Sequence, residues 1–240
     1  KNNVLLGCVF PNRTQSGIAN AKKILDSGEL GKMRIVEFQY RGYRSHEYYS
    51  ASYWRGSKAI NGGGCLINQG SHGIDALVYL AGNVERVCAV CDTMGRNIDG
   101  EDTAAALLEF ENGAHGTLMG TVLSYYPEKN SECDRIRIEC EKGTIVFADG
   151  KTMLYKSLSE DEFKVEEIQL SDKVESFGER PEDMDMDAHN TVVSNFIDGI
   201  LKGEKLIAPA RDARRAIDLI LTIYKSAETQ IWENVPHYEF

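Results

Sequence analysis

Hydrophobic and polar residues alternate with different periods along the chain, and each period predicts an element. Residues 16–27 place apolar side chains on one stripe, which is typical of an amphipathic helix. Residues 33–41 alternate apolar and polar positions, which predicts a strand. Residues 4–10 form a short apolar run that predicts a buried strand. Residues 41–61 are aromatic and polar without a period, which predicts a long loop.

A helix is expected over residues 66–81, and a run of short strands after it. Turn signals such as Glu111-Asn112-Gly113 separate these strands and favour hairpins. The expected strands are 84–92, 103–109, 114–123, 135–140, 144–147, 152–156 and one near 165–170. Strands in one run between helices predict an α+β fold, a mostly antiparallel open sheet with helices on one face.

The last third of the chain predicts a polar, acidic loop over residues 170–187 and two closing helices. Pro209 suits the first turn of the second helix. The apolar stripe of the first helix consists of Val192, Val193, Phe196, Ile197, Ile200 and Leu201, and that of the second of Ile217, Ile220, Leu221 and Tyr224. We expect both stripes to be buried.

The net charge and the cysteines limit the partners, the location and the metal sites that we expect for this protein. The net charge is -10, which argues against nucleic acid or an anionic membrane as the main partner. No apolar run is long enough to span a bilayer and no signal peptide opens the chain, so we expect a cytoplasmic protein with reduced thiols. Cys88 and Cys91 form a C-x-x-C, but on a strand they point to opposite faces, so no metal site is expected.

Candidate chemistry lies on the helix predicted over residues 66–81. At 100° per residue, Asn68, His72 and Asp75 fall within about 60° of one another. An imidazole between an amide and a carboxylate can serve as a proton donor or acceptor near neutral pH. The alternative is a solvated polar face with a structural histidine, in which Asp75 bonds a nearby backbone group.

Residues before this helix could complete a binding site. The glycines 62–64 let backbone come close to a ligand, and Trp54 and Arg55 lie just upstream. Arg13 follows the first predicted strand and could clamp a hydroxyl-rich or anionic substrate, or could be an ordinary surface arginine. An aromatic cluster could stack on a sugar ring or cover a core edge; it comprises Tyr40, Tyr43, Tyr48, Tyr49 and Tyr53.

The segment Y-W-R-G-S-K-A-I-N-G-G-G-C-L-I-N-Q-G-S-H-G-I-D resembles the signature of the glucose-fructose oxidoreductase / inositol dehydrogenase / rhizopine-catabolism (Gfo/Idh/MocA) dehydrogenases, in their C-terminal domain. The likeness extends to V-L-L-G-C-V-F-P-N-R, similar to the strand that joins the family's two domains, and to the two closing helices. It therefore covers nearly the whole chain.

The resemblance implies that residues 1–240 are a substrate-binding and oligomerisation domain, and that the Rossmann domain for NAD or NADP lies outside this chain. His72 would be the acid/base residue that handles the substrate hydroxyl proton. The family often has Asp where this chain has Asn68, and an amide would orient substrate by hydrogen bonding instead. Trp54, Arg55 and Arg13 match positions that line the family's cleft.

Two functions follow from these residues. The first is hydride transfer between NAD(P) and a carbohydrate or cyclitol, with this chain inactive on its own. The second is a non-catalytic sensor or assembly relative of the same fold. In either case the resemblance implies a homodimer or tetramer formed through the free face of the sheet, on which residues 104–108 present apolar side chains.

Overall fold

A computed structural model describes residues 4–125, 133–168 and 187–238. Those residues form one sheet of nine strands in the order β8-β7-β6-β5-β1-β4-β3-β2-β9. Every pair of neighbours is antiparallel except β1 and β4, which are parallel. The strands are β1 (Met33–Arg41), β2 (Val84–Asp92), β3 (Thr103–Phe110), β4 (His115–Thr121), β5 (Cys133–Cys140), β6 (Gly143–Ala148), β7 (Lys151–Ser157), β8 (Phe163–Glu167) and β9 (Glu233–Asn234).

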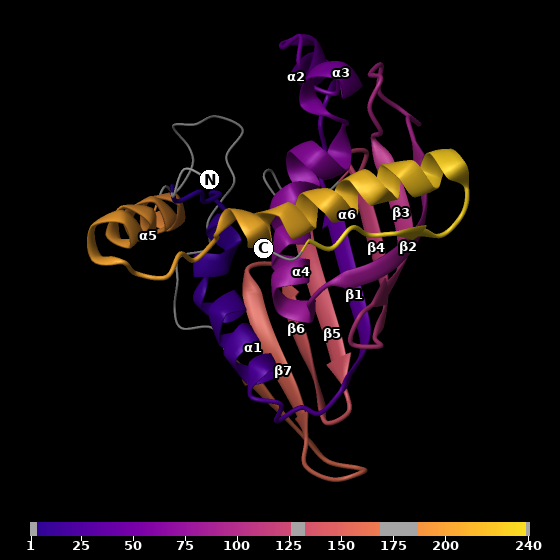
Figure 1. The fold of residues 1–240 in the computed structure, drawn as a ribbon. Helices are drawn as coiled ribbons and strands as arrows, with labels where there is room; N and C mark the ends of the chain where they lie inside the picture. The colour runs from indigo at the N-terminus through magenta and orange to yellow at the C-terminus, as the bar shows by residue number, and fades with distance from the viewer. Residues whose placement is uncertain (1–3, 126–132, 169–186, 239–240) are drawn as a thin grey trace.

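Helices cover one face of this sheet, and the hydrophobic core lies between the two layers (Figure 1). The helices are η1 (Pro11–Thr14), α1 (Ser16–Asp26), α2 (His46–Ser50), α3 (Lys58–Asn61), η2 (Leu66–Gly70), α4 (Ser71–Ala81), α5 (Asp187–Lys202) and α6 (Ala210–Thr229). α1, α4 and α6 lie against the strands, whereas α5 lies to one side and packs on η1 (Figure 1). None of the helices in the described ranges is long and apolar enough to cross a membrane.

The α+β prediction is confirmed, and most strand bounds agree with it to within two residues. The strand predicted over residues 4–10 is wrong. Only Gly7 pairs there, in an isolated bridge with Pro209, and the side chains of Val4 and Leu6 are 78% and 69% exposed. The segment 41–61 contains α2 and α3, so it is less irregular than predicted. The predicted acidic loop lies outside the described residues up to Asp187, which begins α5.

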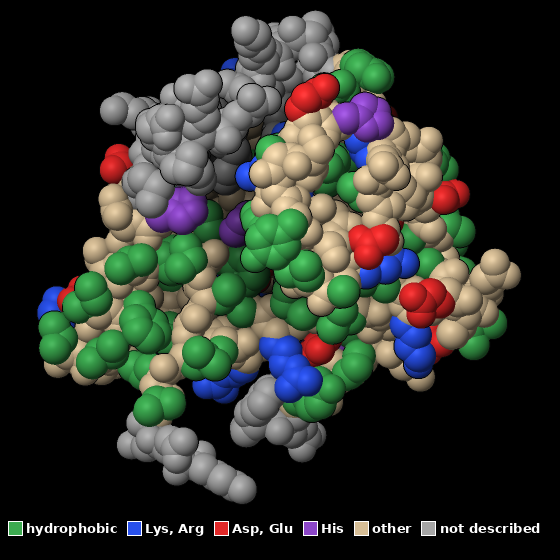
Figure 2. All heavy atoms as spheres, turned by 90° about the horizontal axis from the view of Figure 1, so that it is seen from above, with side chains coloured by type: hydrophobic (Ala, Val, Ile, Leu, Met, Phe, Trp, Pro, Cys, Tyr) green, Lys and Arg blue, Asp and Glu red, His purple; other side chains and the backbone are tan. Residues whose placement is uncertain are grey.

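The apolar stripes of the closing helices are only partly buried. α5 buries Val192 but exposes the side chains of Val193, Ile197, Ile200 and Leu201. α6 buries Ile220 and packs Tyr224 against the core as predicted, but Leu221 is exposed. The buried stripe of α6 also includes Ala216, Leu219 and Ile223, which were not predicted. The exposed side of α5 belongs to the hydrophobic side chains that gather at the left of Figure 2.

No helix of the described residues covers the second face of the sheet. β3 alternates buried and partly exposed residues, so that Ala104, Ala106 and Leu108 face the helices while Leu107 faces away. Val90 and Met119 are exposed on neighbouring strands, at 68% and 42%. The open face predicted for the sheet is therefore present and is apolar over β2, β3 and β4.

Candidate active site

The candidate residues Asn68 and His72 lie on either side of a junction between a π-helix and an α-helix. Residues 66–70 form a π-helix, η2, and α4 follows directly, so the single α-helix predicted over 66–81 is wrong in its first turn. A π-turn is wider than an α-turn and is frequent at functional sites. Asn68 lies in the π-turn and His72 in the first α-turn.

The triglycine segment is closed against the protein's own backbone. A Cβ added to Gly64 would lie 2.0 Å from the carbonyl oxygen of Glu101, and one added to Gly63 would meet the ring and hydroxyl of Tyr224. The buried carboxylate of Glu101 accepts hydrogen bonds from the amides of Gly64 and Leu66. Gly63 and Gly64 therefore serve close internal packing, and the approach of a ligand to this segment stays a prediction.

His72 packs against one aromatic ring, that of Phe10. The ring of Phe10 meets it edge to face, with centroids 5.8 Å apart and planes at 83°. Its Nδ1 is buried and has no hydrogen-bond partner among the described residues, and the same holds for Nδ2 of Asn68. Burial, and then repulsion from His189, lowers the pKa of His72 below its ordinary value.

Asp75 faces Arg13 rather than a cleft. Two guanidinium nitrogens of Arg13 donate to the two carboxylate oxygens of Asp75, at 2.8 and 2.6 Å, and both side chains are fully buried. A third contact of Arg13, at 3.1 Å, goes to the carbonyl of Ile207. Although burial alone would lower the pKa of Arg13, the hydrogen bond and ion pair with Asp75 raise it overall.

The Arg13–Asp75 ion pair decides between the alternatives that the sequence left open for Asp75 and for Arg13. Asp75 has a structural role, but its partner is a side chain and not the backbone group expected. The alternative of an ordinary surface arginine for Arg13 is wrong, because its guanidinium ties η1 to α4 and lies 3.5 Å from Asp212 of α6. All contacts of Arg13 that the structure describes are internal, and its role as a substrate ligand stays a prediction.

Arg55 connects the long segment 41–61 to the candidate helix. Its guanidinium stacks over Tyr48, 4.2 Å from the ring centroid, and over Trp54 at 5.3 Å. The Tyr48 hydroxyl in turn accepts a hydrogen bond from Gln69 in the π-turn. Nε of Arg55 is buried without a partner in the described ranges. The predicted residues Trp54 and Arg55 are thus joined to η2 through one tyrosine.

The tyrosines of the predicted aromatic cluster do not share one environment. Tyr40 and Tyr49 are buried in the core, which fits the alternative that they cover a core edge. Tyr43 and Tyr53 are exposed, the latter at 85%. Tyr49, Tyr53 and Arg55 border a hollow of about 510 Å³ next to α2.

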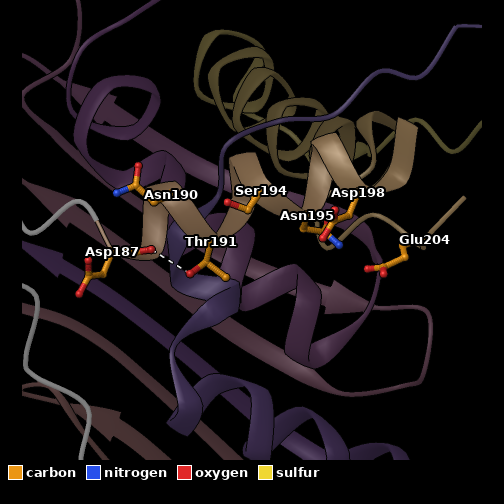
Figure 3. Close-up of a pocket in the computed structure, with 7 residues that line it drawn as sticks. All are labelled: Asp187, Asn190, Thr191, Ser194, Asn195, Asp198 and Glu204. Atoms are coloured by element: carbon orange, nitrogen blue, oxygen red, sulfur yellow. Dashed lines mark hydrogen bonds between the residues drawn. The ribbon is translucent and has the colours of Figure 1, made fainter. Parts of the chain in front are cut away.

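A hollow of about 640 Å³ lies along the polar side of α5 and is drawn in Figure 3. Two of the polar side chains that line it bond to backbone atoms. Thr191 donates to the carbonyl of Asp187, and Asn195 bonds both the carbonyl of Lys205 and the amide of Ile207. No group of three or more metal-ligating side chains occurs in the parts of the chain that the structure describes.

Two residues beside His72 were missed by sequence reasoning. Phe10 was assigned to a buried strand, and His189 was not singled out at all. The signal for His189 was weak, since one histidine at the start of a helix, after an acidic segment, has no partner at a regular spacing.

The described residues thus combine an open sheet, covered on one face by helices, with a partly buried histidine on the central helix, α4. The chain belongs to the Gfo/Idh/MocA family, because the family's C-terminal domain model matches residues 18–146.

Two curated relatives are similar over part of the chain. Levoglucosan dehydrogenase of Pseudarthrobacter phenanthrenivorans is 27% identical over 142 residues, which are 50% of this chain and 36% of the relative. A 1-carboxy-3-chloro-3,4-dihydroxycyclohexa-1,5-diene dehydrogenase of Comamonas testosteroni is 30% identical over 118 residues, 45% of this chain and 27% of that protein. The matched part is thus about a third of the first relative and about a quarter of the second.

Solved structures match the whole chain. The WlbA dehydrogenase of Bordetella pertussis, in complex with NADH and UDP-GlcNAcA, is 28% identical with a TM-score of 0.76; the match covers 98% of this chain and 64% of that one. A levoglucosan dehydrogenase in complex with NADH and levoglucosan is 22% identical with a TM-score of 0.82, over 98% and 68%. The second likeness concerns the fold alone. This chain spans about two thirds of these structures.

Proposed function

We propose that this chain is the substrate-side domain of an NAD(P)-dependent oxidoreductase that moves hydride between nicotinamide and a carbohydrate or cyclitol hydroxyl. The observation that carries the proposal is the pair of buried nitrogens on Asn68 and His72 without partners among the described residues. Buried polar atoms are rarely left unpaired unless a ligand or water completes them. These two atoms lie on the segment that resembles the family's signature.

The relatives support the substrate and cofactor classes. WlbA is described with NADH and UDP-GlcNAcA, and levoglucosan dehydrogenase with NADH and levoglucosan. Both ligand pairs combine a nicotinamide with a sugar-type molecule. We extend these classes to the present chain as a whole, without choosing one sugar or choosing between NAD and NADP.

The residues of this chain fit one end of such a cofactor only. The triglycine backbone is filled by Glu101 and Tyr224, so it offers no cradle for a pyrophosphate. The polar turn at Asn68 and His72 fits the reacting end, where the nicotinamide, when bound, supplies the hydride acceptor. We therefore place the dinucleotide's main binding site in a separate Rossmann domain and expect this chain alone to be inactive.

In this proposal His72 takes the proton. When an alcohol is oxidised, its O–H bond breaks and the proton passes to the imidazole, while the C–H hydride leaves and the C=O bond forms. A lowered pKa keeps His72 neutral, and so able to accept a proton, at neutral pH. The Asn68 amide would hold the same oxygen or a neighbouring hydroxyl, with Arg55, Trp54 and Arg13 forming the surroundings of the substrate.

Exposed apolar residues support the domain arrangement. Val4, Leu5 and Leu6 are exposed beside the strand-like bridge at Gly7, and α5 exposes Ile197, Ile200 and Leu201. Contiguous apolar surface of this kind marks an interaction site. We assign it to contact with the Rossmann domain, and the open sheet face to a homodimer or tetramer. Cys8, Cys65, Cys88, Cys91 and Cys140 are free thiols, which favours a cytoplasmic location.

The test uses the full-length protein. Sugars, sugar acids, nucleotide sugars and inositols are screened with NAD and NADP by absorbance of the reduced nicotinamide, for wild type and His72→Ala. We expect turnover on one substrate class, and a loss of about 10²–10⁴-fold in the variant, the usual contribution of general acid–base catalysis.

His115→Ala serves as the control, because His115 is an exposed histidine at the start of β4. Turnover that survives in His72→Ala would remove His72 from the chemistry. Cofactor binding without turnover on any substrate class would favour the non-catalytic sensor instead.

A further inference from the structure

A glutamine on the π-turn is bonded to a tyrosine from a different element. Gln69 directly follows Asn68 in η2, and its Nε2 donates a hydrogen bond to the hydroxyl of Tyr48, 3.1 Å away. Tyr48 belongs to α2, which stands above the start of α4 in Figure 1. This contact fixes one side of the Gln69 amide, so the direction of the other side is fixed as well.

Tyr48 is itself held in place by several contacts. The Ser45 side chain accepts a hydrogen bond from its backbone amide at 3.2 Å, and Arg55 donates to its carbonyl at 3.1 Å. The guanidinium of Arg55 also lies 4.2 Å from the centroid of its ring, and that of Arg44 lies 5.2 Å away. Gln69 is thus bonded to an aromatic side chain that two cations and two contacts to its backbone keep in position.

The other side of the Gln69 amide has no partner among the described residues. Its Oε1 is buried and accepts no hydrogen bond from them, and Nδ2 of Asn68 is likewise buried without an acceptor. Of these two atoms, Oε1 is an acceptor and Nδ2 is a donor. Buried polar atoms are rarely left unpaired unless a ligand or an ordered water completes them. Two successive residues of one turn thus present an unpaired acceptor and an unpaired donor.

Hydroxyl groups match this acceptor and donor better than an acidic group does. An alcohol oxygen accepts a hydrogen bond and its O–H donates one, so hydroxyls on a ligand can serve both amides. A carboxylate only accepts, and it would meet the lone pairs of Gln69 Oε1. A hydroxyl has a single proton, and in the proposed reaction the proton of the reacting hydroxyl goes to His72. The hydroxyl that donates to Gln69 must therefore be a different one.

We propose that Gln69 is a specificity-determining residue, whose Oε1 accepts a hydrogen bond from a substrate hydroxyl other than the one that is oxidised. This inference rests on the proposed function. A substrate that lacks this second hydroxyl would leave Oε1 buried and unpaired, so it should be selected against in kcat/KM. Tyr48 is then a positioning residue, because it acts on the substrate only through Gln69.

The experiment compares D-glucose, D-glucuronic acid and myo-inositol with their monodeoxy analogues in the full-length protein. For one hydroxyl that is not oxidised, we expect its removal to lower kcat/KM of the wild type about 10–100-fold. In Gln69→Leu the parent sugar should lose about this factor and the analogue should not, so that the ratio between them approaches one. Tyr48→Phe keeps the ring and removes only the hydroxyl, so it should lose part of the ratio. Gln39→Leu is the matched control, at a partly exposed glutamine of β1, and should preserve the ratio.

A merely structural role of Gln69 would lower kcat/KM for parent and analogue alike, and an unchanged ratio in Gln69→Leu would overturn the proposal. So would a wild type that is indifferent to every hydroxyl it does not oxidise, a result that needs no variant to fold. Calorimetric binding of the same sugars separates the two failures. Binding that depends on the second hydroxyl and on Gln69, without hydride transfer, would remove the proposed function alone. Turnover with an unchanged ratio would remove the role of Gln69 alone, and sugars that neither bind nor react would overturn both.

Discussion

At the scale of single residues, the Arg13–Asp75 pair illustrates how a buried charge binds elements together. Both side chains are fully buried, and the contact is bidentate. Such a pair need not be a net source of stability, because two charges must leave water. Its removal from one side is nevertheless costly, since without Asp75 the buried Arg13 keeps only the longer, 3.5 Å contact with the partly exposed Asp212. The ion pair thus holds η1 and α4, and with them Phe10 and His72, in a fixed relation.

Asp75→Asn should therefore lower the free energy of unfolding by about 3–5 kcal/mol, measured by urea denaturation. The double variant Arg13→Met/Asp75→Leu should lose much less than the two single changes together, because no unpaired charge remains. Asp198→Asn, in the exposed ion pair with Lys202, should cost less than about 1 kcal/mol. A loss in Asp75→Asn as small as that in Asp198→Asn would show that the pair is not the connection we describe.

The sequence predicts residue types better than residue partners. Asn68 and His72 could be selected because, with Asp75, they share one face of the predicted helix, opposite an apolar face. Arg13 and Asp75 were both selected as well, but nothing in their spacing shows that they face each other across 62 positions. His189 could not be found, because its relation to His72 exists only after α5 has packed on η1.

At the scale of elements, the start of the central helix depends on three contacts of Glu101. Its carboxylate accepts hydrogen bonds from the amides of Gly64 and Leu66 and from the hydroxyl of Tyr224. Glu101, from the segment between β2 and β3, thus accepts hydrogen bonds from amides at the start of the helix. Without this buried carboxylate these amides would have no partner within the helix. The close approach that makes this possible requires that residue 64 has no side chain.

Gly64→Ala should lower the free energy of unfolding by at least about 1–3 kcal/mol, the usual cost of overpacking, because its Cβ would clash with backbone at 2.0 Å. Gly70→Ala is the matched control on the same segment. Its Cβ would meet nothing closer than 3.7 Å, and alanine suits a helix better than glycine by roughly 0.5–1 kcal/mol. Thermal unfolding of both variants tests the pair, and equal melting temperatures would contradict the packing described.

Strand bounds were predictable and the first element was not. The alternation over 33–41 and 84–92 specifies β1 and β2 to the residue, because one face of each strand is buried and the other is not. The apolar run at Val4–Phe10 led to the prediction of a strand that the structure does not have. A run of apolar residues does not reveal whether a partner strand is present. The π-turn at η2 likewise left no mark in the periodicity.

At the scale of the whole molecule, the sheet face that lies away from α1, α4 and α6 exposes apolar side chains. Leu107, Val90 and Met119 form an exposed apolar area on three neighbouring strands. We expect Leu107→Arg to lower the molar mass of the full-length protein in light scattering to that of a smaller assembly, since a charge on this area would be desolvated on association. Leu158→Arg, an equally drastic change at an exposed leucine after β7, should leave the mass unchanged. An unaltered mass in Leu107→Arg would place the interface elsewhere.

The position of β1 has a consequence for how the chain acquires its fold. β1 lies in the interior of the sheet, and Ile35 pairs with His115 on one side and Glu139 on the other. During synthesis β1 therefore leaves the ribosome before its neighbours β4 and β5 have been made. The apolar residues of β1 stay unpaired during that time. Contacts of such long sequence separation slow folding and expose strands to aggregation. Truncation before β5 should consequently yield insoluble chains rather than a smaller folded domain.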